Sequence, residues 1–311
     1  MSRSSRSSAK RAAAPAPIPG FTAVPHANPA GGNAAGLEER LARLEQRLTE
    51  LTFMQGLSGG PALHIACAAQ FITRTHGVIF PPLRGSLAGQ RVAVLASGPT
   101  LRQAPSLEGC LTTACNHSYT FLGGAGPDFY AAADYVPWNR EYIDAALREL
   151  PGECRIFLGY YVSPGTPPEM QIPWALREDP RVTTFCAAAS PFPRMELELY
   201  PVYHNSSIAH DMLHLMLYMS PDIIYLLGCD CSPTGYFDDR SNPAQTTMDA
   251  GALIHGYNML RALQQTHRPH TRIVSVNPVG LRGVFEDVYT PQFLALHPEL
   301  RVSAAQVVER I

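Results

Sequence analysis

Small and polar side chains follow five apolar segments of this sequence, and their types suit the binding of a phosphate group. The first set is Ser97-Gly98-Pro99-Thr100, directly after the segment GQRVAVLA. The other sets are Asn116, Asp134, Gly228-Cys229-Asp230 and Asn277-Pro278. Backbone N–H groups of a glycine turn, hydroxyls and amides can all hold an anion. The turn at 97–100 differs from both common phosphate loops, GxxxxGK[ST] and GxGxxG, and each set alone is ordinary turn chemistry.

Lysine is absent from the part of the chain that we expect to fold. Lys10 is the only lysine, and it lies in the N-terminal tail. This excludes a Walker-type lysine, a Schiff-base lysine and a lysine general base. A phosphate bound here would be held by backbone N–H groups, hydroxyls, arginine, histidine or tyrosine.

The elements that would position these side chains follow from the hydrophobic pattern. Buried strands are predicted over 91–95, 111–115, 127–134, 154–160, 181–185, 222–230 and 272–278. Helices are predicted over 140–150, 207–219 and 249–266. Strands that alternate with helices and are mostly apolar on both faces predict an α/β fold, with a doubly wound, mostly parallel sheet and helices on both faces. Ligands bind beyond the carboxyl ends of such strands, so the five sets should converge in one crevice.

Three parts of the chain differ in composition. Residues 1–35 are rich in Ser, Ala, Pro and Gly, which predicts a disordered tail. Residues 36–56 predict an amphipathic helix, with leucines at 37, 41, 44, 48 and 51. This spacing is that of a heptad seam, too short to hold firmly alone. It favours homo-oligomerisation through residues 37–51, the alternative being a helix packed on its own domain. Residues 62–311 predict a single α/β domain.

Composition and charge exclude several classes of protein. The net charge of −2 gives no sign of a general nucleic-acid binder. No apolar run approaches the roughly 20 residues that span a bilayer, so we expect no integral membrane segment. The first 20 residues lack the apolar stretch of a secretory signal. The seven cysteines have no metal-ligand spacing, which predicts reduced thiols and a cytoplasmic location.

The order of the strand-end motifs resembles one superfamily of bacterial proteins. The motifs read VAVLASGPTL, ACNHSYTFL, GPDFYAAAD, NSSIAHDMLHLMLYMSPDIIYLLGCD and IVSVNPVGL. The superfamily contains the sialyltransferases of glycosyltransferase family 42 and the 6-hydroxymethylpterin diphosphokinase MptE-like proteins. The resemblance covers residues 88–290. It implies a Rossmann-like nucleotide-binding domain that is a variant of the GT-A type.

The resemblance assigns the first three strand ends to a nucleotide. The family turn G-[NST]-G-P-S-L reads ASGPTL here, with alanine in place of the first glycine. It implies nucleotide contacts by Ser97, Gly98, Pro99 and Thr100. Asn116 matches an asparagine near the nucleotide and sugar. Asp134 stands where the sialyltransferases carry asparagine and the MptE-like proteins usually carry aspartate, which favours the wider superfamily. The alternative for Asp134 is a turn residue or a helix cap.

The resemblance continues through the second half of the chain. Ser206 and Ser207 match residues that contact the sugar nucleotide, although either could simply cap the following helix. Asp230 matches a Gly-x-Asp motif and would orient the cytidine or stabilise the next loop. That loop, 231–249, is long and rich in Gly, Pro and Asp, which favours a lid. Within it, Tyr236 matches a tyrosine that holds the leaving phosphate, or is a packing residue.

The last candidates are three histidines in predicted helices and the residues after the final strand. His255 lies in the region of the family's general-base histidine. Asn277 and Arg282 follow the last strand, and Arg282 is a candidate partner for a phosphate or carboxylate, or a solvated arginine. His210 and His214 are four residues apart in a predicted helix, but without the HExxH pattern we expect surface or core histidines and no metal site.

Three functions are compatible with these residues. The leading hypothesis is a glycosyltransferase that moves a sugar, such as a nonulosonic acid, from a CMP-activated donor to a glycan or protein acceptor. It would need no metal or other cofactor; His255 would be the general base, and Tyr236 with the 97–100 turn would hold CMP. The second is an MptE-like, Mg²⁺-dependent diphosphokinase using ATP, with carboxylates from Asp134, Asp230, Asp238 and Asp239. The third is a non-catalytic protein that binds a nucleotide sugar.

Overall fold

The structure is a computed structural model that describes residues 72–133, 137–161, 179–188, 192–233, 235–238 and 249–311, together with Leu44, Ala69 and Ser190. The predicted tail over 1–35 lies outside the described residues, as do most of the predicted helix over 36–56 and the candidates Asp134 and Asp239.

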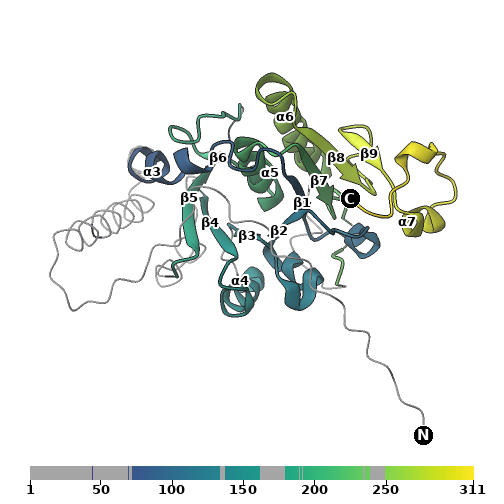
Figure 1. Cartoon of the computed structure of the whole chain (residues 1–311), viewed down its shortest axis with the longest axis horizontal. Helices are drawn as coiled ribbons and strands as arrows, with labels where there is room; N and C mark the ends of the chain where they lie inside the picture. Colours follow the sequence, from purple (N-terminus) through teal and green to yellow (C-terminus); the bar gives the residue numbers. More distant parts are fainter. Residues whose placement is uncertain are drawn as a thin grey trace, which may run out of the picture.

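The described strands form one nine-stranded sheet in which every neighbouring pair is parallel (Figure 1). The strand order is β6-β5-β4-β3-β2-β1-β7-β8-β9. The strands are β1 Arg91–Leu95, β2 Leu111–Cys115, β3 Phe129–Ala132, β4 Arg155–Tyr161, β5 Val182–Ala188, β6 Val202–Tyr203, β7 Ile223–Leu227, β8 Arg272–Val276 and β9 Glu286–Val288. This confirms the predicted α/β, doubly wound, Rossmann-like sheet.

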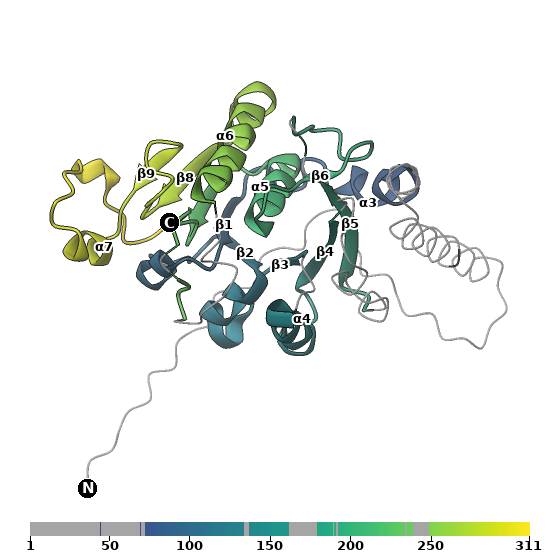
Figure 2. The same cartoon turned by 180° about the vertical axis from the view of Figure 1, so that it is seen from behind.

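Helices cover both faces of the sheet. The α-helices are α3 Gly77–Ile79, α4 Pro137–Glu149, α5 Ile208–Met219, α6 Ala250–His267 and α7 Pro291–Leu296. Segments of other helix types are Ile72–His76, Pro81–Leu83, Pro99–Gln103, Asn116–Ala125 and Ala304–Gln306. Figures 1 and 2 show α5 and α6 on one side of the sheet and α4 on the other.

The two apolar layers explain why the strands read as continuous apolar runs. In β1, Val92 and Val94 pack into the core under α5, whereas Ala93 and Leu95 pack into a core on the opposite face. In β3, Tyr130 joins the core that α4 covers. Most residues of the central strands are buried from one side or the other, so alternation between apolar and polar residues is lost there.

All seven predicted strands and all three predicted helices are present, with boundaries that shift by a few residues. The predicted strand 222–230 ends at Leu227, because Gly228 turns the chain with φ at +65°. Two short strands were not predicted. They are β6 and β9, which lie at the two edges of the sheet and contain two and three residues.

The path of the chain reverses beside β1. From β1 to β6 each new strand is added on one side of the sheet, and the chain then returns through α5 to place β7 on the other side of β1. The boundary between β1 and β7 is therefore a topological switch point. In open parallel sheets, ligands bind beyond the carboxyl ends of the strands at this point.

Candidate functional site

The turns that follow β1 and β7 are held against each other at the switch point. The Gly98 N–H donates to the carbonyl of Gly228 over 2.8 Å. A Cβ on Gly98 would lie 2.5 Å from that carbonyl oxygen, and a Cβ on Gly228 would lie 2.5 Å from the carbonyl oxygen of Ala96. Because any side chain would force the strands apart, both positions require glycine.

Asp230 fills the position that an anion would take at the 97–100 turn. Its carboxylate accepts hydrogen bonds from the backbone N–H of Thr100, at 2.9 Å, and from the Thr100 hydroxyl. Burial raises the pKa of Asp230, and the hydrogen bonds from Thr100 offset part of that rise. Asp230 thus ties the turn after β7 to the turn after β1, a contact that differs from both roles expected for it, orientation of the cytidine and stabilisation of the next loop. A phosphate at the Thr100 N–H would have to displace this carboxylate.

An aromatic cluster surrounds His117, directly after β2. His117 is buried, and its ring lies 4.9 Å from the Tyr142 ring of α4 and 4.8 Å from the Tyr236 ring. The Phe237 ring stacks on it at 5.6 Å. On the same histidine, Nε2 lies 3.6 Å from a carboxylate oxygen of Asp238. Rings from α4, from the end of β2 and from the segment after β7 thus converge at one place.

Asn116 and Ser97 connect this aromatic cluster to the switch point. The Phe237 N–H donates to the carbonyl of Ser97 over 2.9 Å, so the segment with Tyr236 is fixed against the β1 turn. Asn116 precedes His117 and has φ of 52°, in the left-handed region that few residues other than glycine adopt. Among the described residues, nothing hydrogen-bonds its buried Oδ1 atom. Asn116 is therefore a candidate ligand contact, because its buried amide oxygen lacks a partner among the described residues, and asparagine tolerates this backbone region better than most residues.

Ser206, Ser207 and His255 form a second group, at the starts of α5 and α6. The Ser207 hydroxyl caps α5 by accepting from the N–H two residues on, at 3.2 Å, so the capping role is confirmed. Ser206 is exposed and has φ of 62°. The Asn205 amide donates to the carbonyl of Ala252 over 2.7 Å and thereby ties the two helix starts together. His255 lies in the next turn of α6 and is exposed.

Asn277 and Arg282 lie toward the β9 edge of the sheet. The buried Asn277 amide donates to the carbonyl of Gln103 over 3.0 Å and accepts from the Thr290 N–H over 2.8 Å. Its polar atoms are therefore used within the protein, and we assign it a structural role instead of the expected ligand contact. Arg282 is exposed, beside Asp287.

Two buried features of the site were not predicted from the sequence. One is His117, whose only sequence signal is its position after Asn116. The other is a pair at the end of β6, where Nδ1 of His204 lies 2.7 Å from Oδ1 of Asp211. A carboxylate that orients an imidazole is a recurring feature of general bases. Cys115, the last residue of β2, has a raised pKa, mainly because it is buried. The charges of Cys229 and Asp211 add to this rise, so Asp211 lies near the end of β2.

The two histidines in the HxxxH spacing bond to backbone groups. His214 accepts from the Tyr203 N–H at 2.9 Å and donates to the Arg194 carbonyl at 2.8 Å. Nε2 of His210 lies 3.1 Å from the Leu253 carbonyl oxygen. Burial lowers the pKa of both rings to about 4. Within the described part of the chain, no group of three or more His, Cys, Asp or Glu side chains is arranged to hold a metal ion.

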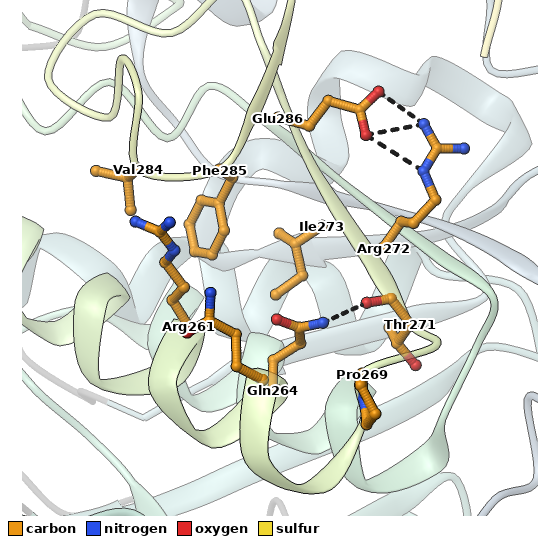
Figure 3. Close-up of a pocket in the computed structure, with 10 residues that line it drawn as sticks. Arg261, Gln264, Pro269, Thr271, Arg272, Ile273, Val284, Phe285 and Glu286 are labelled. Carbon is orange, nitrogen blue, oxygen red and sulfur yellow. Dashed lines mark hydrogen bonds and ion pairs between the residues drawn. The ribbon is translucent and has the colours of Figure 1, made fainter.

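A pocket of about 250 Å³ lies at the amino ends of β8 and β9, whereas the predicted site was expected at the carboxyl ends of the strands (Figure 3). Figure 3 shows Arg261 of α6 extending toward Val284 and Phe285. Another wall carries the ion pair of Arg272 with Glu286, at 2.6 Å. None of the predicted site residues lines this pocket. The predicted residues belong instead to the carboxyl edge, where the aromatic cluster lies.

No protein-family model, curated protein or solved structure matches this chain. The fold therefore defines its class, which is an α/β protein with a doubly wound, Rossmann-like sheet. None of the helices in the described ranges has both the length and the apolar character needed to cross a membrane.

Proposed function

We propose that the chain is a glycosyltransferase that moves a sugar of the nonulosonic acid type from a CMP-activated donor to a glycan or protein acceptor. The observation that supports this most is that the ring of Tyr236 lies 4.8 Å from that of His117, which is far away in the sequence and follows Asn116 directly. Asn116 and Tyr236 both match motifs of the sialyltransferases. They lie beside the switch point, where parallel sheets bind ligands.

The aromatic cluster suits a nucleotide. The partly exposed rings of Tyr142 and Tyr236 offer apolar faces to a planar base, and the Asn116 amide can hydrogen-bond to a base or sugar. Phosphate contacts would come from the Tyr236 hydroxyl and from backbone N–H groups near Ser97, because the domain has no lysine. Thr100 is not needed, since Asp230 already accepts its hydrogen bonds.

The transfer would proceed by direct displacement. The acceptor hydroxyl oxygen attacks the anomeric carbon of the sugar, and the bond from that carbon to the phosphate oxygen of CMP breaks. CMP leaves with the bonding electron pair, and a hydrogen bond from Tyr236 stabilises the charge on its phosphate. The proton of the acceptor hydroxyl passes to His255, which is exposed on α6 and open to an incoming acceptor. No metal or other cofactor takes part in this scheme.

A magnesium-dependent diphosphokinase that uses ATP is the second candidate. The observation in its favour is the carboxylate of Asp238 within the aromatic cluster. Carboxylates of this kind hold Mg²⁺ beside phosphates. Asp230, expected to be a further ligand, is instead hydrogen-bonded to Thr100.

We place the protein in the cytoplasm, because the six cysteines described in the structure are unpaired thiols.

Release of CMP from CMP-linked nonulosonic acids, with and without glycan acceptors, tests the proposal. We expect release in the presence of EDTA, and its loss in the His255→Ala variant. His267→Ala is the matched control, because His267 is also exposed on α6 but at the opposite end. Transfer of pyrophosphate from ATP that requires Mg²⁺ would favour the diphosphokinase. Binding of CMP sugars without turnover of any donor would favour a non-catalytic binding protein.

A further inference from the structure

Large apolar side chains are exposed together at one end of the sheet, beside the edge strand β6. Val78 of α3 is 71% exposed, and Leu199, just before β6, is 68% exposed. Leu199 belongs to the connection between β5 and β6. In this connection, Phe192 is 66% exposed and Tyr200 is 43% exposed. We call these four residues the α3 patch. Exposed apolar groups that gather in this way mark interaction surfaces.

The segments that carry the α3 patch are bonded to each other. His76, two residues before Val78, has its Nδ1 atom 2.8 Å from the carbonyl oxygen of Leu197 and 3.1 Å from that of Tyr200. The guanidinium of Arg194 lies 5.8 Å from the centre of the Tyr200 ring. Figures 1 and 2 both show α3 beside β5 and β6. The patch therefore belongs to one packed surface.

A second apolar feature lies shortly before this surface in the sequence. The leucines at 37, 41, 44, 48 and 51 have heptad spacing, and we call them the leucine seam. Leu44 is the seam residue that the structure describes; it is helical and 59% exposed. Leu44 is therefore open to a partner surface in the single chain, and the other seam leucines lie outside the described residues.

We propose that the leucine seam of one chain docks on the α3 patch of a second copy, and the reverse, in a homodimer with two-fold symmetry. The seam and the patch are both apolar, and Leu44 and the four patch residues are exposed in the single chain. Only residues 52–71 separate Leu51 from Ile72, which lies directly before α3. Because the seam and the patch are close in the sequence, one chain can offer both to the same partner, and an exchange between two copies covers both pairs of surfaces.

The size of the two surfaces explains why both are needed. Burial of an aliphatic side chain removes roughly 60–120 Å² of apolar surface from water. Stable interfaces bury about 800 Å² on each partner. Five leucines or four patch residues each fall short of that area, whereas together they approach it. A helix of two heptads is also too short to be stable without such a partner surface.

Sedimentation equilibrium of the full chain tests the proposal. We expect a mass twice the 33.9 kDa of the chain, and at least a tenfold weaker dimer for both Leu199→Glu and Leu44→Glu. Leu296→Glu is the matched control, because Leu296 is also exposed, at 64%, but lies on α7 at the far end of the sheet. This control should remain dimeric. An unchanged far-ultraviolet circular dichroism spectrum would show that each variant is folded.

Two results would overturn the proposal. One is a monomeric wild-type chain at all concentrations. The other is a Leu199→Glu variant that dimerises like the wild type while Leu44→Glu does not, because the seams would then pair with each other and leave the patch uncovered. As a second measurement, a mixture of Leu44→Cys chains and Leu199→Cys chains should form a disulfide-linked pair under mild oxidation. Absence of that pair would also contradict the docking.

Discussion

Acidification from pH 7 to pH 5 should destabilise the fold, because three fully buried histidines are neutral in the native state. His76, His210 and His214 are each 0% exposed. Burial lowers the pKa of each ring from 6.5 to about 4. The backbone bonds described above suit the neutral ring. Nε2 of His76, for example, accepts from the Cys186 N–H at 2.8 Å, which a protonated ring could not do.

The sign and size of the effect follow from proton linkage. Each folded pKa lies below the unfolded value, so between pH 6.5 and pH 4 the unfolded chain binds more protons than the native state. Stability is therefore lost as the pH falls through about 6.5, and the loss is complete near pH 4. At pH 5 it is about 2 kcal/mol for each histidine and about 6 kcal/mol for the three. Whole domains have only roughly 5–15 kcal/mol of stability.

Urea unfolding at several values between pH 5 and pH 7.5 measures this dependence. Near pH 5.5 the free energy of unfolding should change with pH as if unfolding took up about 2.6 protons. His76→Gln keeps an acceptor for the Cys186 N–H and a donor for the Leu197 carbonyl, but it cannot titrate. This variant should therefore lose about a third of the slope, whatever its absolute stability. An uptake below one proton, or an unchanged slope in the variant, would refute the reasoning.

Three substitutions at the switch point and the aromatic cluster give further predictions. Gly98→Ala should lower the free energy of unfolding by about 2 kcal/mol or more in urea titration. Gly152 has open space around it, so Gly152→Ala should change that free energy by no more than about 0.5 kcal/mol. Equal effects of the two substitutions would contradict the close contact between the turns after β1 and β7. Asp230→Ala leaves the buried Thr100 N–H without its acceptor and should cost about 1–3 kcal/mol by the same measurement, more than Asp230→Asn does. Tyr236→Phe keeps the ring beside His117, so the melting temperature should change little. It removes the hydroxyl, so kcat for CMP release should fall about 100-fold. An unchanged kcat would exclude the Tyr236 hydroxyl from the reaction.

Burial on both faces is what made the central strands predictable. Strands such as β1 and β7 carry unbroken apolar runs because side chains from both of their faces enter a core. The edge strands β6 and β9 have no such run. β9 is Glu-Asp-Val, with a single apolar residue, and it pairs with β8 at the edge of the sheet. No local pattern encodes a pairing of that kind.

Only part of the site could be predicted, because several of its contacts join side chains from different turns and strands. Parallel topology predicts that the ends of β2 and β7 meet at one edge, and the structure places the ring of Tyr236 against that of His117, the residue after Asn116. The pairing of Asp230 with Thr100 needed a three-dimensional view, because it depends on two turns that are in contact only at the switch point. His204 is a similar case. Its partner Asp211 lies on a buried helix face among apolar residues, where sequence alone does not distinguish an ion pair from a core position.

A thermal-shift panel with CMP, CDP, UMP and ATP, each with Mg²⁺ and with EDTA, tests the central claim most directly. Ligand at a hundredfold over its Kd adds about 2.7 kcal/mol, which raises the melting temperature of a domain this large by a few degrees. We predict a shift with CMP that persists in EDTA, is lost in Asn116→Ala, and is kept in Asn258→Ala, a control on the exposed face of α6. No shift with CMP, or a shift with ATP and Mg²⁺ alone, would contradict the account.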